Sequence, residues 1–211
     1  MCSSDLVQWT LQEDLAWSTA SSAWVSDLKA GLDAKGKLTA LESDFIMAPG
    51  MDYRMVGAML AGMPEMPVPP ISGGPAQFGF GAVTQPYVIP NEFHQGAGAR
   101  VELMKPDSGV GLRGNIMRTP GQRQHVCALE SILNEAAAAA GADPAQFRID
   151  HTSDARLVEI IRKTTAEAGW TPRPSPNPAA RRTGDAPVKG RGFAAMYRFG
   201  AYWAGVAEVE V

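Results

Sequence analysis

One stretch decides the fold, Met117–Ser131, which has the sequence MRTPGQRQHVCALES. It joins a Pro-Gly turn to a segment whose apolar residues recur at steps of three and four, the spacing of one helical face. These residues are Val126, Leu129, Ile132, Leu133, Ala136, Ala137 and Ala140. Gly141 follows them and predicts a left-handed C-terminal cap. The stretch therefore predicts a long amphipathic helix that begins just after a rigid turn.

The turn itself suggests a binding site. A helix start presents unpaired backbone N–H groups and the positive end of the helix dipole, here beside Arg118, and this suits an anionic or oxo ligand. Pro120 stiffens the turn, and Gly121 lets a bulky group approach the backbone. Many helices start after Pro-Gly with nothing bound, so an ordinary helix start is the alternative that the residues alone favour.

Two further helices and a strand pair are predicted after this helix. Asp143 and Pro144 form an N-cap and first helical position. The next helix is expected from about Ser153 to Ala168. Prolines in 171–190 exclude helix and central strand and indicate a linker, and its arginines and lysines are interpreted as a solvated loop. The pattern from residue 192 to 211 predicts two strands.

Upstream of the turn the strongest signal is a hairpin. Residues 23–32 and 37–47 both alternate apolar and polar residues, and DAKG between them supplies a turn in which Gly36 can take positive φ. The N-terminal QWTLQEDLAWS predicts a strand followed by a short polar segment. The Met- and Pro-rich residues 48–81 predict a long loop, and extended structure is expected in TQPYVIPN and ARVELMK.

Composition narrows the class of protein. With 45% hydrophobic residues, 19% charged residues and a net charge of −3 over 211 residues, the chain is typical of a soluble globular protein with no attraction to nucleic acid. No segment reaches the roughly 20 apolar residues of a membrane span. The two cysteines form no disulfide framework and fit a reducing compartment.

Common catalytic constellations are missing from the sequence. His125 cannot serve as the base for Cys127, because helical residues two apart point about 200° apart, so Cys127 is interpreted as a small buried filler rather than a nucleophile. His94, His125 and His151 are scattered, and no cysteine pair has metal-ligand spacing, so no metal ligand and no catalytic residue is assigned. The residues alone indicate an α+β protein.

The order of several stretches resembles the xanthine dehydrogenase/aldehyde oxidase family, in its large, molybdopterin-binding subunit. These stretches are QWTLQEDLAW, DLKAGLDAKGKLTALESDF, YVIPN, RTPGQRQHVCALESILNEAAAAAGADPAQFR, ARLVEIIRKTTAEAGW and GRGFAAMYRFGAYWAGVAEVEV. VQWTLQEDLAW is similar to the bacterial branch that includes the large subunits of nicotinate dehydrogenase and isoquinoline 1-oxidoreductase. The resemblance implies mixed sheets with packed helices.

The resemblance also implies roles for the turn. In the family this turn reaches the molybdenum ligands, so Arg118 and Thr119 would face the cofactor, with Met117 and Gly121 beside them as further cofactor-binding residues. Pro120 would form a wall of the substrate pocket that the family often builds with an aromatic residue. Proline there removes a stacking surface for a flat heteroaromatic substrate.

For the whole protein, the resemblance implies an internal fragment of a molybdenum hydroxylase. Residues 1–170 would be the C-terminal part of the first molybdopterin-binding domain, 171–190 a linker, and 191–211 the opening strands of the second domain. The general-base glutamate would lie beyond the C-terminus, so the chain alone would be inactive.

The cofactor and partners also follow from the resemblance. The complete enzyme would carry molybdenum-molybdopterin in its cytosine dinucleotide form and take a small-molecule substrate. It would pass electrons to a [2Fe-2S] small subunit and on to a flavin or cytochrome c partner, in the cytoplasm or after export of the folded parent. A non-catalytic anion-binding or assembly module is the alternative function.

Overall fold

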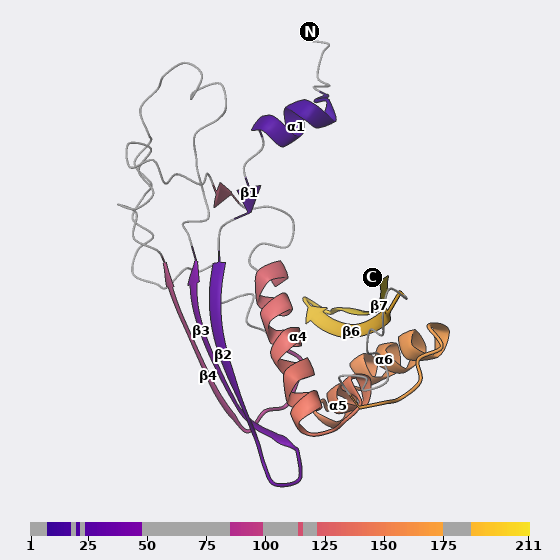
Figure 1. Cartoon of the computed structure of the whole chain (residues 1–211). Coiled ribbons are helices and arrows are strands. Elements are labelled where there is room, and N and C mark those ends of the chain that lie inside the picture. The colour runs from indigo at the N-terminus through magenta and orange to yellow at the C-terminus, as the bar shows by residue number, and fades with distance from the viewer. Residues whose placement is uncertain are drawn as a thin grey trace.

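A computed structural model describes residues 8–17, 20–21, 24–47, 85–98, 114–115, 122–174 and 187–211 (Figure 1). It confirms the predicted α+β class. A three-stranded sheet packs on one side of a long central helix, α4 (Gln122–Ala139), and two shorter helices and a strand pair pack on its other side.

The three-stranded sheet contains the predicted hairpin. Strands β2 (Trp24–Leu32) and β3 (Leu38–Met47) are antiparallel, and Gly36 in their turn has a φ of 77° as expected. Strand β4 (Asn91–Gly98) adds to β3 in parallel. The sheet is therefore mixed, and its order is β2-β3-β4.

Helix caps fix the ends of the three consecutive helices. Gly141 ends α4 with a φ of 64°, confirming the predicted left-handed cap. Helix α5 (Pro144–Asp150) is capped by Asp143, whose carboxylate accepts hydrogen bonds from two backbone N–H groups. Helix α6 (Ala155–Glu167) is capped by Asp154 in the same way. Both caps place a side-chain oxygen where the first turn lacks acceptors.

The C-terminal residues form the predicted strand pair. Strands β6 (Lys189–Arg198) and β7 (Ala201–Glu210) are antiparallel, and β7 packs on α6 while β6 contacts α4 and α5. Arg191 does not lie in a free basic patch, because its guanidinium donates to Gly169 O and stacks on Trp170 with 5.5 Å between Cζ and the ring centroid.

A single apolar core joins these elements. It contains Leu38 and Leu41 of the sheet, Leu129 and Leu133 of α4, and further residues of α5, α6 and β6. The remaining fully buried aliphatic members include Leu157 and Ile161 of α6. Helix α4 thus contributes apolar side chains to both of its neighbours.

Two predictions near the N-terminal half are wrong. QWTLQEDLAWS was expected to hold a strand, but Leu11–Trp17 forms helix α1, because Thr10 and Glu13 exchange the hydrogen bonds of a capping box. Within TQPYVIPN, residues 85–90 lie outside strands and β4 starts at Asn91. Prolines at 86 and 90 supply no backbone donor for a ladder. ARVELMK and residues 48–81 lie outside the described residues.

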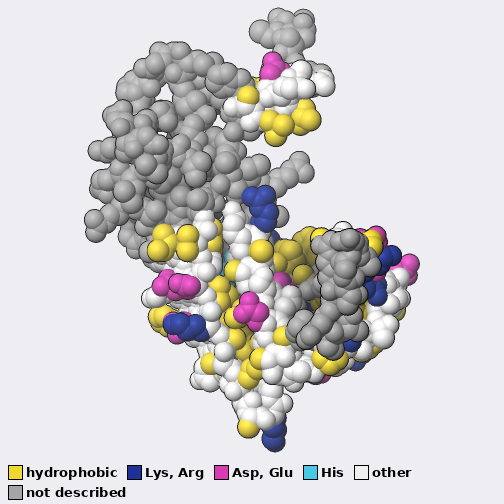
Figure 2. Space-filling model, in the orientation of Figure 1, with side chains coloured by type: hydrophobic (Ala, Val, Ile, Leu, Met, Phe, Trp, Pro, Cys, Tyr) yellow, Lys and Arg dark blue, Asp and Glu magenta, His cyan; other side chains and the backbone are white. Residues whose placement is uncertain are grey.

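The described surface mixes apolar and charged side chains. Figure 2 shows apolar, acidic and basic side chains mixed over the described surface. On the three-stranded sheet Val25, Ile46 and Phe93 are exposed, and Lys29 of β2 forms an ion pair with Glu42 of β3. The two-residue strands β1 (Ala20–Ser21) and β5 (Gly114–Asn115) pair in parallel. Within the described ranges, no helix combines the length and the apolar character needed to cross a membrane.

Candidate functional site

The predicted site residues lie just before the first described residue of α4. Met117, Arg118, Thr119, Pro120 and Gly121 are all outside the described residues, so their assignment stays a prediction. The described residues nearest to this turn are those of the helix start that it feeds.

The first residue of α4 is polar and deeply buried. Gln122, its first residue, is 1% exposed, and its side-chain Nε2 donates to Tyr197 O in β6 at 3.3 Å. Its Oε1 is buried, and no described residue donates a hydrogen bond to it. The first turn of this 18-residue helix carries no acidic side chain, so no carboxylate of that turn offsets the helix dipole or accepts from the N–H groups that lack an acceptor within the helix.

His125 lies one turn further along the same helix face. It is 2% exposed, and its Nε2 is buried without a partner among the described residues. Burial, together with the nearby His94, lowers the pKa of His125 from 6.5 to about 4. The imidazole is therefore neutral at pH 7. Sequence reasoning did not assign His125 a role, although a histidine on the apolar face of a predicted helix is a signal that it could have used.

A buried ion pair holds α4 against its neighbours. Arg148 Nε donates to Glu130 Oε2 at 2.9 Å, and both side chains are almost completely buried. The Glu130 carboxylate also accepts from Tyr87 OH at 2.8 Å and from Ala195 N at 2.7 Å. Burial and the Glu130 charge raise the pKa of Tyr87 well above its ordinary value.

Every side-chain nitrogen and oxygen atom of the pair has a hydrogen-bond partner, and such pairing is the condition under which a buried ion pair is tolerated. The Nη1 and Nη2 groups of Arg148 donate to Pro144 O and Glu130 O, and the guanidinium lies over the Phe193 ring. It joins α4, α5, β6 and the segment before β4, so it fixes the position of α4 rather than taking part in chemistry.

One sequence prediction about α4 is wrong. Cys127 was expected to be a small buried filler, but its side chain is exposed. It lies about 200° around the helix from the buried Leu129, so it faces away from the core. Among the described residues, no three histidine, cysteine or carboxylate side chains are grouped to hold a metal ion.

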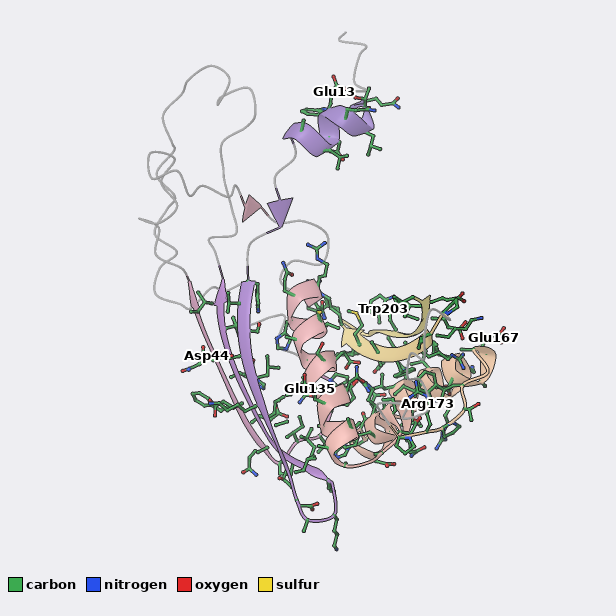
Figure 3. All side chains as sticks on the ribbon, viewed as in Figure 1. Glu13, Asp44, Glu135, Glu167, Arg173 and Trp203 are labelled. Carbon is green, nitrogen blue, oxygen red and sulfur yellow. The ribbon has the colours of Figure 1, made fainter. Side chains whose placement is uncertain are left out.

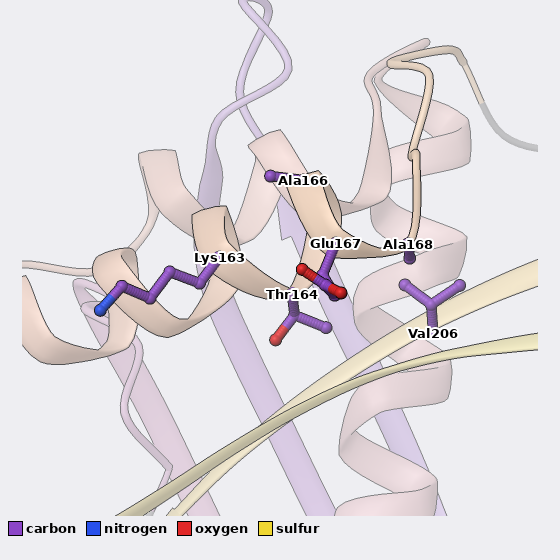
Figure 4. Close-up of a pocket in the computed structure, with 6 residues that line it drawn as sticks. All are labelled: Lys163, Thr164, Ala166, Glu167, Ala168 and Val206. Atoms are coloured by element: carbon purple, nitrogen blue, oxygen red, sulfur yellow. The ribbon is translucent and has the colours of Figure 1, made fainter.

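A surface hollow of about 760 Å³ lies elsewhere, between the end of α6 and β7 (Figure 4). It is lined by Lys163, Thr164, Ala166, Glu167, Ala168 and Val206. Its charged groups point outward from α6, and Lys163 pairs with Glu159 at 2.7 Å on the same helix. The hollow contains no buried titratable group from the described part of this chain, so its chemistry is that of an open surface.

The start of α4 is therefore the candidate site. The N–H groups of its first turn have no acceptor within the helix, which suits an anion, and Gln122 Oε1, to which no described residue donates, suits an N–H or O–H donor.

Solved structures define the class of fold. The chain superimposes on the aldehyde oxidoreductase from Desulfovibrio gigas with a TM-score of 0.57 and 18% identity, covering 89% of this chain and 19% of that one. Quinoline 2-oxidoreductase from Pseudomonas putida 86 gives a TM-score of 0.54 and 14% identity, covering 84% of this chain and 22% of that one. The fold is thus that of part of these oxidoreductases.

Sequence relatives identify the family. A subunit of the nicotinate dehydrogenase of Pseudomonas putida is 32% identical over 97% of this chain and 16% of its own length. The aldehyde oxidoreductase molybdenum-binding subunit PaoC of Escherichia coli K12 is 28% identical over 86% of this chain and 22% of its own length.

No family model matches the chain. The two relatives nevertheless confirm the predicted resemblance: the chain is related to the molybdenum-binding large subunits of the xanthine dehydrogenase/aldehyde oxidase family. It spans less than a quarter of the length of these curated relatives, at 16% and 22%.

Proposed function

We propose that the chain supplies part of the molybdenum-cofactor pocket of a molybdenum hydroxylase large subunit. The observation that carries the proposal is the 32% identity to the nicotinate dehydrogenase subunit along 97% of the chain. The buried, carboxylate-free start of α4 supports it, because such a helix start suits the anionic and heterocyclic parts of a pterin cofactor.

The bound cofactor would supply the redox chemistry, in which a C–H bond of an aldehyde or N-heterocycle is replaced by a C–O bond with water as oxygen source and two electrons and two protons leave. This chain's residues would bind and orient. The backbone of Arg118 and Thr119, flanked by Met117, would face the cofactor, Gly121 would allow its close approach, and Pro120 would limit the substrate pocket.

We also propose a cofactor form, electron-transfer partners and a compartment for the complete enzyme. The cofactor would be the cytosine dinucleotide form, and electrons would leave through a [2Fe-2S] subunit to a flavin or cytochrome c partner. The general-base glutamate would come from outside these residues, so the 211-residue chain alone would not turn over substrate. Either the cytoplasm or a compartment reached by export of the folded parent would suit it.

We also propose the division into domains that the resemblance implies. Residues 1–170 would belong to the first molybdopterin-binding domain and 191–211 to the second, with 171–190 as linker. The proline content of the linker supports this division. The Gln122–Tyr197 hydrogen bond would then hold the two domains together beside the cofactor.

The test is to express the complete reading frame with its neighbouring subunits and measure bound molybdenum and pterin. The wild-type protein is expected to contain about one molybdenum per chain. Gly121→Val should reduce this content several-fold, because the branched side chain blocks the close approach of the cofactor. The matched control is Gly192→Val, since Gly192 lies on β6 with open space where a Cβ would be.

Two results would overturn the proposal. A wild-type protein that is folded but free of molybdenum and pterin would remove the family function. Equal cofactor content in the two glycine variants would instead show that the turn before α4 does not face the cofactor.

A further inference from the structure

One face of the β6–β7 strand pair has no charged side chain over most of its length. In an antiparallel pair, directly opposed residues share a face, and successive residues of a strand alternate between the two faces. Four opposed pairs therefore form one face, and these eight residues are termed the outer face: Gly190–Val209, Gly192–Ala207, Ala194–Gly205 and Met196–Trp203.

The charged residues of the same stretch all lie on the opposite face, which packs on the helices. That face contributes Phe193 and Ala195 to the apolar core. It also carries two cross-strand ion pairs, Lys189–Glu210 and Arg191–Glu208. The charges are thus on the helix side of the strand pair, and the side without a described helix has none.

The three-stranded sheet shows the pattern that is usual for a face in water. Its face away from the core carries Asp27 and Lys29 on β2 and Glu42 and Asp44 on β3. Antiparallel sheets with one solvated face place polar residues there. The β6–β7 pair departs from this pattern, because both of its faces are apolar between residues 192 and 207, as in a sheet that is covered on both sides.

The outer face is shaped to receive another element. Glycine and alanine occupy its middle, and a Cβ built on Gly192 or Gly205 would meet no described atom within 4 Å. Larger side chains stand at its ends, where Trp203 is 49% exposed and Val209 is 58% exposed. Small residues allow close approach of a second backbone, and a half-exposed tryptophan is a common anchor of an interface.

The outer face is too small to hold a separate protein on its own. Seven strand residues span about 23 Å and two paired strands about 10 Å, so the face covers roughly 230 Å². A standard interface takes about 800 Å² from each partner. A segment of the same polypeptide needs less area, because the connection gives it a high effective concentration.

We propose that an uncharged segment of the same polypeptide, from outside these 211 residues, covers the outer face in the complete large subunit. Large aliphatic side chains of this segment would lie over the glycine and alanine residues, and Trp203 would pack beside them. The chain spans 16% and 22% of the length of its curated relatives, so most of such a subunit lies outside these residues. The inference rests on the proposed function in one respect, that the chain is part of a large subunit.

The test compares alkylation of two neighbouring positions on opposite faces, in the 211-residue chain and in the complete large subunit with its partner subunits. Ala207→Cys places a thiol on the exposed outer face, and Glu208→Cys places one on the other side, where the native side chain is 67% exposed. Both should react at similar rates in the 211-residue chain. In the complete subunit the rate for Ala207→Cys should fall by about tenfold or more, and the rate for Glu208→Cys should stay the same.

A second measurement identifies what covers the face. Trp203 is replaced in the complete enzyme by the photo-crosslinking aromatic p-benzoylphenylalanine, and the crosslinked peptide is sequenced by mass spectrometry. The expected peptide belongs to the large subunit outside these 211 residues. A crosslink to the small subunit, to a second copy or to another part of this chain overturns the proposal.

Equal alkylation of Ala207→Cys in the 211-residue chain and the complete subunit also overturns it, because the face would then be open in both. Neither measurement requires bound cofactor. A complete subunit that protects Ala207→Cys but contains no molybdenum would therefore contradict the proposed function and leave this inference standing.

Discussion

His125 makes the stability of the chain depend on pH. Its folded-state pKa of about 4 lies below the ordinary 6.5, so between these values the unfolded state binds the proton and the folded state does not. Stability therefore falls as the pH is lowered from 6.5 to 4, by at most about 3 kcal/mol for a shift of this size. Denaturant unfolding at several pH values measures this loss.

The variant His125→Gln isolates the contribution of His125 to the pH dependence of stability. Glutamine keeps a polar side chain but does not titrate, so the loss of stability between pH 6.5 and 4 should be smaller than in the wild-type chain. Ionisable groups that do not interact with His125 contribute equally in both proteins and cancel in the difference. Identical pH profiles would show that His125 is not the buried titrating group.

Local sequence rules correctly predicted the conformations of residues that depend only on their neighbours in the sequence. Asp143 as a cap and Gly36 and Gly141 at positive φ were predicted correctly, because each position is set by the turn it occupies. The exposure of Cys127 was predicted wrongly, because a position at the edge of a helix face is decided by the neighbouring element that packs there. The turn residues 117–121 remain a prediction from resemblance.

At the scale of elements, Gly96 sets how closely β4 packs on β3. A Cβ at this position would lie less than 3.0 Å from carbon atoms of the Phe45 ring, which is itself stacked on Trp24 at 4.7 Å between centroids. Gly96→Ala should therefore destabilise the chain by about 1–3 kcal/mol through overpacking. Equilibrium unfolding in urea measures the change.

The control for this substitution is Gly192→Ala. Gly192 also lies in a strand, but a Cβ there meets nothing within 4 Å, so its change in stability should be small. If the two substitutions changed stability equally, strand propensity rather than contact with Phe45 would determine the loss of stability in Gly96→Ala.

Sequence reasoning missed two elements, β4 and α1, for different reasons. β4 has the sequence NEFHQGAG, which lacks a clean apolar alternation, and its ladder comes from β3 in parallel. Helix α1 was missed because its signal is the Thr10–Glu13 capping box, not an apolar face. The β2–β3 hairpin and helices α4 to α6 were predicted because their patterns are local and regular.

For the whole molecule, the Glu130–Arg148 pair joins the β6–β7 pair to the helices. Glu130→Gln leaves the Arg148 charge buried without its partner, and breaking a buried pair in this way destabilises a protein by about 3–5 kcal/mol. Because Glu130 also accepts from Ala195 N, the amides of β6 should lose hydrogen-exchange protection together with those of α4.

The matched control is Glu135→Gln on the same helix, where the side chain is exposed (Figure 3). This change removes the same charge without touching the pair, so exchange in β6 should stay as in the wild-type chain. If Glu130→Gln left the protection of the Ala195 amide unchanged, the Glu130 carboxylate would not be what holds β6 against α4.

The parallel pairing of β3 with β4 has a consequence for the order of folding. The β2–β3 hairpin closes over a five-residue connection, residues 33–37, and hairpins form in about 1–10 μs. β4 can join only after the chain between Met47 and Asn91 has closed into a loop, which carries a larger entropy cost and slows assembly. During synthesis, β3 therefore leaves the ribosome before β4 does. The backbone edge of β3 that pairs with β4 stays unpaired until β4 has been synthesised.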